Sequence, residues 1–259
     1  MNPEIFQQLI LGIIQGITEW LPLSSSGMTT LAMTNIFGID NISIILHQAL
    51  FLHLGTFFAA LIYFRKEVKS ILSFKKKTRK VLNFLIITTL ITGILGILLM
   101  KFLINNLELT GRTITFAIGF LLLITGGMQL ISRKKGLKTE KQITNSDGII
   151  AGLAQGLAVL PGISRSGITT STLLLKKFND TSALRLSFLM SLPVVLLGNI
   201  FLNLPDFAKI LTPFSIIGLI TSFIFGILTI HLLMKLSKKI NFAWFAIIFA
   251  ILMLVSVLV

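Results

Sequence analysis

Long apolar segments dominate the chain, and short polar or basic stretches separate them. The segments 81–100, 113–131 and 242–259 approach or reach the roughly 20 apolar residues with which a helix crosses the hydrocarbon core of a bilayer. Hydrophobic residues make up 54% of the 259 residues and charged residues only 12%, which is more apolar sequence than the core of a soluble protein of this size requires. The pattern predicts an all-α polytopic membrane protein.

Lysine and arginine gather in three short stretches, at 65–80, 133–141 and 235–239. Short loops rich in these residues stay on the cytoplasmic side of a cell membrane, so we expect a multi-pass protein of the plasma membrane with all three stretches inside. This orientation accounts for the net charge of +14 without a nucleic-acid partner. The chain has no cysteine, so disulfides and thiolate chemistry are excluded.

With all three basic stretches on the cytoplasmic side, the apolar segments between them determine how often the chain crosses the membrane. Six spanning helices result, at about 45–64, 81–104, 113–132, 185–203, 213–234 and 241–259. The turns on the other side of the membrane are expected at 38–43, 105–112 and 204–212.

Two segments, 140 positions apart, repeat one pattern of polar residues. Residues 12–30 read GIIQGITEWLPLSSSGMTT, and residues 152–170 read GLAQGLAVLPGISRSGITT. The arms of each segment are too short to cross a membrane as simple helices, and a Pro–Ser–Gly stretch interrupts each in the middle. We interpret each as a re-entrant helical hairpin, whose non-helical tip is tolerated only where protein or water surrounds it.

The predicted topology places residues 38–44 and their counterparts 178–184 on opposite sides of the membrane. The two halves are therefore expected to be inverted repeats, residues 1–140 and residues 141–259, within a single membrane domain. Inverted repeats are typical of transporter folds, in which the site lies near the bilayer midplane between the halves. We expect a functional site at the same place.

Where the two repeats differ, the differences carry charge. Glu19 is matched by Val159, and Arg165 is matched by Ser25. Glu19 is the one carboxylate predicted at membrane depth, where an ionisable residue marks a functional site. The guanidinium of Arg165 needs an anion, which is either Glu19 or a ligand phosphate. A protonated Glu19 or a purely structural ion pair would be the simpler alternatives.

Hydroxyl and glycine residues surround both charges. Backbone N–H groups at a helix start, with glycines that permit close approach, form an anion cradle, although Ser and Gly also serve helix packing in lipid. The predicted substrate-binding set is Gln15, Ser24, Ser26, Gly27, Thr29, Ser164, Ser166, Gly167 and His53. With Arg165 this set favours a phosphate or pyrophosphate ligand.

Phosphate-ester chemistry needs charge neutralisation, a nucleophile and a proton acceptor. Glu19 is a candidate ligand for Mg²⁺, which binds through one or two carboxylates and the substrate phosphates. A hydroxyl of the serines at 24–26, or a metal-bound water, could attack. His53 lies within plausible reach of the hairpin tips, His47 points to another face of the same predicted helix, and His231 lies near the inner end of its own. An interfacial or hydrogen-bonded structural role is the alternative for each histidine.

At these residues the chain resembles the integral-membrane undecaprenyl-diphosphate phosphatase family, the type associated with bacitracin resistance. The two long motifs of that family are similar to residues 15–27 (QGITEWLPLSSSG) and 161–167 (PGISRSG). The stretches 52–64 and 186–193 also resemble the family, as does the repeat.

The resemblance implies that the terminal phosphate is removed from a polyprenyl diphosphate, which yields the monophosphate carrier. It places the family's catalytic glutamate on Glu19, its serine nucleophile on Ser25 and its phosphate-binding arginine on Arg165. It also implies Mg²⁺ or Ca²⁺ as cofactor, a homodimer, and work at the outer face of the membrane.

Two positions depart from the bacterial pattern. Gln15 stands where a second glutamate is common, and Met28 stands where a histidine is a proposed general base. Either metal and Arg165 suffice, or a residue such as His53 substitutes, or activity is reduced. The pattern is closer to archaeal members, for which another polyprenol carrier is expected.

We therefore predict a membrane phosphatase that recycles a polyprenyl lipid carrier for cell-envelope glycan synthesis. The alternative is a transporter or flippase of a polyprenyl phosphate lipid, because inverted repeats with re-entrant loops suit alternating access. A catalytically silent relative is a third interpretation.

Overall fold

A computed structural model describes residues 2–39, 41–106, 111–132, 136–204, 207–236 and 242–258. Within these ranges the chain is helical and forms no strand beyond one isolated bridge between Lys138 and Phe178. The helices are α1 (Pro3–Thr18), α2 (Ser25–Leu31), α3 (Ile42–Tyr63), α4 (Arg65–Leu72), α5 (Arg79–Asn106), α6 (Gly111–Ile131), α7 (Asn145–Leu157), α8 (Arg165–Leu175), α9 (Asp180–Gly198), α10 (Phe207–Ile210), α11 (Pro213–Leu236) and α12 (Phe242–Leu258). Short π-helical segments, η1 (Ala32–Ile36) and η3 (Asn199–Asn203), continue α2 and α9, and η2 (Glu140–Gln142) is a 3₁₀ turn.

Four helices are long and apolar enough to cross a membrane, judged by length and composition over the described residues. They run over Ser43–Tyr63, Arg79–Leu99, Asp180–Asn203 and Pro213–Lys235, so four of the six predicted spans meet this criterion. The other two, α6 and α12, contain shorter apolar helices over Thr115–Ile131 and Ala246–Val257. The all-α integral membrane class is confirmed, whereas the count of six spans stays a prediction.

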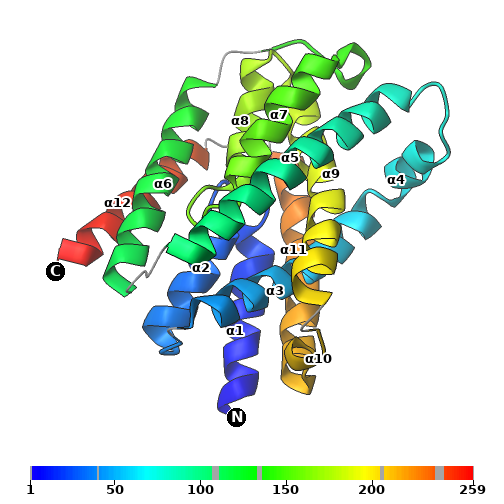
Figure 1. Cartoon of the computed structure of the whole chain (residues 1–259). Helices are drawn as coiled ribbons and strands as arrows, with labels where there is room; N and C mark the ends of the chain where they lie inside the picture. Colours follow the sequence, from blue (N-terminus) through cyan, green and yellow to red (C-terminus); the bar gives the residue numbers. More distant parts are fainter. Residues whose placement is uncertain are drawn as a thin grey trace.

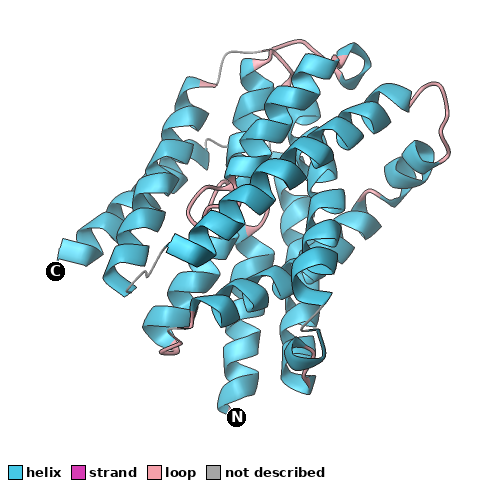
Figure 2. Ribbon diagram, in the orientation of Figure 1, coloured by secondary structure: helices cyan, strands magenta, loops and turns pink. Residues whose placement is uncertain are grey.

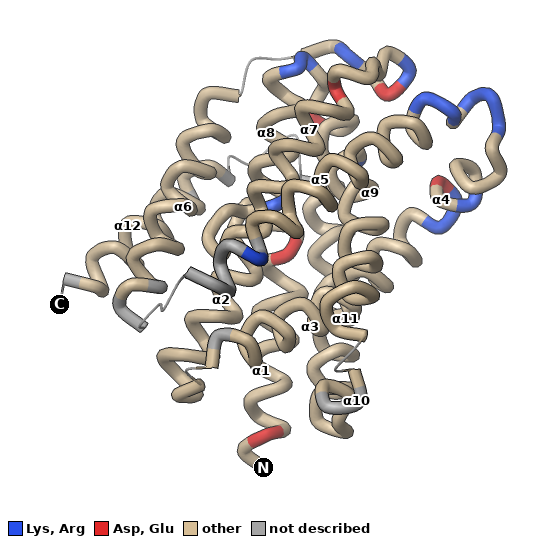
Figure 3. Tube along the Cα trace, in the orientation of Figure 1, with Lys and Arg blue, Asp and Glu red and all other residues tan. Residues whose placement is uncertain are grey.

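Some predicted loops fall partly outside the described residues. This applies to the turns expected at 38–43, 105–112 and 204–212 and to the basic stretches at 133–141 and 235–239. The structure describes all of the first basic stretch, residues 65–80. It forms α4 and the loop into α5, and Lys and Arg gather there and in the segment before α7, at one end of the bundle (Figure 3).

Large apolar side chains face outward along the helices at the periphery of the bundle. Leu90 and Ile94 of α5, Phe120 of α6, Leu228 of α11 and Leu252 of α12 are all at least half exposed. Charged residues are rare along these helices (Figure 3). An apolar surface of this extent would be unfavourable in water and suits contact with lipid chains.

The two repeated segments each form a helical hairpin, α1 with α2 and α7 with α8. The hairpins enter the bundle from opposite ends, and their turns meet in its middle (Figures 1 and 2). Hydrogen bonds join the turns: the N–H of Gly162 donates to Ser24 Oγ over 3.0 Å, and Ser166 Oγ and Ser164 Oγ donate to the carbonyl of Leu21 over 2.6 and 3.4 Å. Each second arm begins at a serine N-cap, Ser24 for α2 and Ser164 for α8, as expected for a residue whose hydroxyl accepts from an otherwise unpaired N–H group.

Each hairpin packs on a long helix of the other half of the chain. The first arm α1 packs on α11, and the corresponding arm α7 packs on α5. The repeat-matched glycines Gly12 and Gly152 allow both contacts, because a Cβ atom at Gly12 would lie 2.5 Å from the carbonyl oxygen of Gly218 and one at Gly152 would lie 3.1 Å from the Thr88 backbone. Close backbone approach at small residues is how helices pack tightly in a membrane. The reciprocal packing places the hairpin turns between the two halves.

Candidate active site

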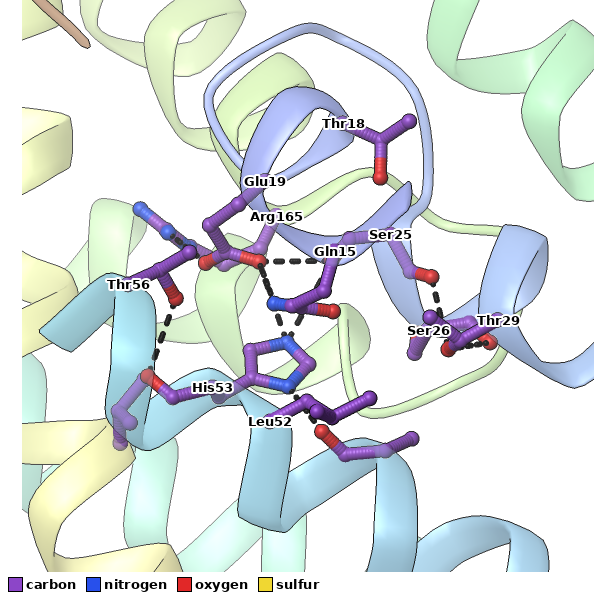
Figure 4. Close-up of polar contacts among 12 residues, drawn as sticks. Gln15, Thr18, Glu19, Ser25, Ser26, Thr29, Leu52, His53, Thr56 and Arg165 are labelled. Carbon is purple, nitrogen blue, oxygen red and sulfur yellow. Dashed lines mark hydrogen bonds and ion pairs between the residues drawn. The ribbon is translucent and has the colours of Figure 1, made fainter. Parts of the chain in front are cut away.

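Glu19 lies at the end of α1, where the first hairpin turns, and only 5% of its surface is exposed. Its Oε2 atom accepts hydrogen bonds from Gln15 Nε2 at 2.9 Å and from Ser25 Oγ at 2.6 Å. The same oxygen lies 3.2 Å from Nε2 of His53, and Oε1 is paired with the guanidinium of Arg165. Figure 4 shows these side chains arranged around the one carboxylate. A buried carboxylate with this many donors is held in a single orientation.

Arg165 is the first residue of α8 and brings a positive charge to the same place. Its guanidinium donates to Glu19 and, over 3.2 Å, to the carbonyl oxygen of Ser187 on α9. It also lies over the ring of Trp20, 5.6 Å from the centroid, and Trp20 packs edge-to-face on Phe188 at 5.0 Å. Guanidinium groups stack on aromatic faces in this way. The contacts fix the cation from three sides.

Ser25 and His53 complete the group of reactive side chains. Ser25 Oγ lies 3.4 Å from Nε2 of His53, and Nδ1 of His53 lies 2.7 Å from the carbonyl oxygen of Ala49. Because a carbonyl oxygen only accepts, Nδ1 carries a proton, and Nε2 is the ring nitrogen that gains or loses one. Serine, imidazole and carboxylate are thus within hydrogen-bonding reach of one another, which is the arrangement of an activated nucleophile.

A cavity of ≈ 190 Å³ opens beside these four residues. Its polar lining includes Glu19, Ser24, Ser25, Ser26, His53 and Arg165. Apolar side chains of α3 and α9, among them Leu46, Leu50, Val194 and Val195, form much of the remaining wall. A small polar pocket with apolar walls suits an anionic head group that carries a hydrocarbon chain.

The other predicted binding residues do not line this cavity. The N–H groups of Gly27 and Gly167 donate to their own N-cap serines, each over 3.1 Å, so both amides of the expected anion cradle already have partners. Thr29 Oγ1 donates to the carbonyl oxygen of Ser25 over 2.9 Å. Ser164 and Ser166 both donate to the carbonyl oxygen of one residue of the other turn. These side chains shape and join the hairpins.

Gln15 and Met28, the two departures from the bacterial pattern, have different surroundings. The side chain of Gln15 is buried and holds Glu19, while its Oε1 has no hydrogen-bond partner. Met28 is partly buried in an apolar cluster with Leu23, Ile118 and Leu122 and is not among the cavity-lining residues. His53, on another helix, is the histidine that reaches the cavity.

The remaining histidines are engaged elsewhere. Nδ1 of His47 lies 2.7 Å from Oδ1 of Asn203, and the ring of His231 packs against Tyr63 at 6.2 Å. Both histidines therefore fit the structural role that was the alternative to a catalytic one.

Sequence reasoning did not identify three further polar residues of the cavity wall. Thr92 lies on α5, Gln155 on α7 and Ser191 on α9. The match of Gln155 to Gln15 in the repeat was the one signal available for this group. Nothing distinguishes Thr92 or Ser191 from the other hydroxyl residues in the apolar segments.

Together the fold and the site define a class: an all-helical integral membrane protein whose buried cavity combines a carboxylate, a guanidinium, a serine and a histidine. This is a set of groups that phosphoryl chemistry uses. The profile of the family described as "Bacitracin resistance protein BacA" matches residues 8–255, and the chain belongs to this family.

Curated relatives match over most of the chain. A protein of Methanococcoides burtonii, named undecaprenyl-diphosphatase, is 44% identical over 255 residues, which cover 94% of this chain and 95% of the relative. A protein of the same name from Methanothrix thermoacetophila is 38% identical and covers 94% and 93%. One from Halothermothrix orenii is 42% identical over 194 residues, with 74% and 72% covered.

Proposed function

We propose that this chain is a membrane phosphatase that hydrolyses a polyprenyl diphosphate to the monophosphate and inorganic phosphate, and so recycles a lipid carrier for cell-envelope glycan synthesis. The proposal rests on the convergence of Glu19, Ser25, His53 and Arg165 in one cavity whose remaining lining is mostly apolar. Family membership and the name shared by the curated relatives support the same activity.

In the proposed reaction Arg165 binds the terminal phosphate, because its planar fork matches phosphate oxygens. Ser25 Oγ attacks the terminal phosphorus, and the bond from that phosphorus to the bridging oxygen breaks, so the polyprenyl monophosphate leaves. Glu19 orients Ser25 and His53 in the resting site through contacts of 2.6 and 3.2 Å. The serine hydroxyl then turns from Glu19 to Nε2 of the neutral His53 ring, which takes its proton. Water then hydrolyses the phosphoserine and restores Ser25. The 3.4 Å contact between Ser25 and His53 is of the kind that tightens in a substrate complex.

A divalent cation fits this site only together with the substrate. No cluster of three or more His, Cys, Asp or Glu residues that could hold a metal exists among the described residues. Glu19 is the one cavity-lining carboxylate, and Oε1 of the neighbouring Gln15 has no partner. Mg²⁺ binds in such places through one carboxylate and the phosphates of the substrate, so Glu19 would hold Mg²⁺ or Ca²⁺, and the ion would supply charge neutralisation.

We further propose that six helices span the plasma membrane and that the two hairpins are re-entrant and inverted. Their entry from opposite ends of the bundle (Figure 1) supports this arrangement. The cavity is lined by the first half of α3 and by the second half of α9. The far end of α3, at Tyr63, is followed by Arg65, and the far end of α9, its first turns, carries Arg185. Both halves lie away from the basic end, so under the positive-inside rule the cavity serves the outer face.

Pockets that enclose drug-sized ligands measure about 300–1,000 Å³. The cavity volume of ≈ 190 Å³ is smaller, so the cavity would hold the diphosphate and only the start of the prenyl chain. The rest of the chain would lie along the apolar walls and in the bilayer. The homodimer implied by the family resemblance stays a prediction, which light scattering of the purified protein would check.

The decisive experiment measures phosphate release from a polyprenyl diphosphate by the protein purified in detergent, with Mg²⁺, Ca²⁺ or a chelator. Release by the wild type and loss in the Ser25→Ala variant would support the proposal. Translocation of the lipid in reconstituted vesicles without phosphate release would instead favour a flippase.

A further inference from the structure

A second polar pair lines the cavity on a wall formed by α5 and α7. Gln155 is only 2% exposed, and its Nε2 donates to Thr92 Oγ1 over 3.1 Å. Thr92 Oγ1 in turn donates to the carbonyl oxygen of Gly152 over 3.0 Å. Oε1 of Gln155 is buried and has no partner. Leaving a buried acceptor unpaired is unfavourable, so this amide is expected to have a ligand.

The internal repeat shows that the two halves use this glutamine differently. Gln155 is the counterpart of Gln15, whose Nε2 donates to Glu19, four residues further along the chain. The position four residues after Gln155 is Val159, which also lines the cavity and offers no hydrogen bond. The first half therefore uses its glutamine to hold the reactive carboxylate, whereas the glutamine of the second half is left facing a cavity.

We infer that Gln155, oriented by Thr92, binds the phosphate that stays on the lipid when the terminal phosphate is removed. This inference rests on the proposed function and adds a site for the second phosphate of the same substrate. Arg165, Ser25 and His53 serve the terminal phosphate, and the pair belongs to other helices, α5 and α7, that line the same cavity.

The amide can offer a donor to this phosphate without losing its contact with Thr92. When the amide turns by 180°, Oε1 accepts from the Thr92 hydroxyl, and both N–H groups of Nε2 become available to phosphate oxygens. The carbonyl oxygen of Gly152 then loses its hydrogen bond from Thr92, but it lies inside α7 and still accepts from the helix backbone. A neutral donor suits the leaving phosphate, since it holds the product without the strong attraction of a second cation.

The test measures the Kd of a short-chain polyprenyl monophosphate for the purified protein, and the KM and kcat for the diphosphate, in four variants. Gln155→Met keeps the length of the side chain and removes the amide, and it should raise Kd and KM about tenfold, the loss of one hydrogen bond to a charged group, with kcat within about threefold. Gln155→Glu should weaken binding further, because a carboxylate repels phosphate. Thr92→Val should also raise Kd and KM, because the amide loses its hydroxyl partner. Thr92→Ser keeps the hydroxyl, and its Kd and KM should equal those of the wild type.

Thr88→Val is the matched control, because Thr88 is a buried threonine one turn earlier on α5 that does not line the cavity. An unchanged Kd and KM in Gln155→Met would overturn the inference and leave the phosphatase proposal standing. Tighter binding by Gln155→Glu than by Gln155→Met would also overturn it, since that order indicates a cation at this position. Binding of the monophosphate that depends on Gln155, in a wild type that releases no phosphate, would refute the proposed function and retain the phosphate site.

Discussion

Arg165 and Glu19 lie on different hairpins and form an ion pair where the two hairpin turns meet. The pair joins the halves of the chain, and it also places a cation beside the serine that faces the cavity. Removing one partner of such a pair leaves the other charge buried and unpaired, which is costlier than the pair is stabilising. Its role in stability and its role in binding therefore have to be separated by experiment.

Substituting Arg165 separates the two roles. Arg165→Ala should lower kcat/KM for a polyprenyl diphosphate by a factor of about 10³ or more, the usual cost of losing a positioned charge at a reacting phosphate. Arg165→Lys keeps the charge but loses the planar fork, so it should recover folding better than activity. Arg185→Ala is the control, because Arg185 pairs at the protein surface with Glu67 and Glu140. A fully active and stable Arg165→Ala variant would remove the residue from the site.

His53 should control how activity depends on pH. Imidazole is the side chain whose charge changes between about pH 5 and 8, and Nε2 of His53 is the atom that exchanges a proton beside Ser25. His53→Gln keeps a hydrogen-bonding side chain without this proton exchange, so kcat should fall by about 10²–10³, as expected for loss of a general base. The pH profile of the remaining activity should be flat between pH 5 and 8. A profile with the wild-type shape would assign the proton transfer to another group.

The metal dependence tests the role of Glu19. Glu19→Gln keeps the shape of the side chain and can accept from Ser25, but it cannot neutralise Arg165 or a cation. We expect turnover to fall at least about 10²-fold and the remainder to respond to Mg²⁺ only at higher concentrations. The measurement is a titration of activity with Mg²⁺ in both proteins after chelation. Equal Mg²⁺ dependence in the two proteins would show that Glu19 is not a ligand.

The sequence predicts most of this site because two physical signals point to it. A carboxylate and an arginine at membrane depth are costly, and the repeat compares each with its counterpart, so Glu19 and Arg165 stand out. The approach of His53 to Ser25 depends on how α3 is rotated in the bundle, which the sequence does not specify. The rotation of α5 likewise decides that Thr92 lines the cavity while Thr88 does not, and no local pattern encodes it.

The sequence motif also could not predict whether the expected anion cradle is free to bind a ligand. Serine before a helix and glycine within its first turn predict both a phosphate site and a simple N-cap. In the structure the N–H groups of Gly27 and Gly167 donate to Ser24 and Ser164. Which partner an N–H group selects depends on side-chain rotamers, and the sequence motif is the same in both cases.

Asp147 should make the stability of the protein depend on pH. It lies in the first turn of α7 at the basic end, is 1% exposed, and accepts from Lys138 and from the N–H and hydroxyl of Thr144. Burial alone raises the pKa of Asp147, but the hydrogen bonds from Lys138 and Thr144 and the charge of Lys138 outweigh it, so the pKa is lowered.

A folded-state pKa below the unfolded value stabilises the protein wherever the carboxylate is ionised. The contribution is therefore complete above the unfolded pKa of about 3.9 and is lost as the pH falls from there through the folded value. Asp147→Asn should lower the free energy of unfolding at neutral pH by about 2 kcal/mol, the scale of a hydrogen bond to a charged group, and reduce the loss of stability in acid. Thermal unfolding in detergent across this pH range measures both effects, and parallel curves for the two proteins would contradict the assignment.

Met28 gives the sharpest test of how this chain replaces the histidine of the bacterial pattern. Its side chain packs among Leu23, Ile118 and Leu122 and does not line the cavity. Met28→His would bring an imidazole into an apolar cluster, so we expect a loss of about 1–2 kcal/mol of stability and no gain in turnover. In the His53→Gln background it should restore no activity, because the new ring has no contact with Ser25. Met28→Leu is the control for packing. Recovery of activity and of the pH profile in the double variant would mean that the imidazole reaches the cavity and that either position can supply the base.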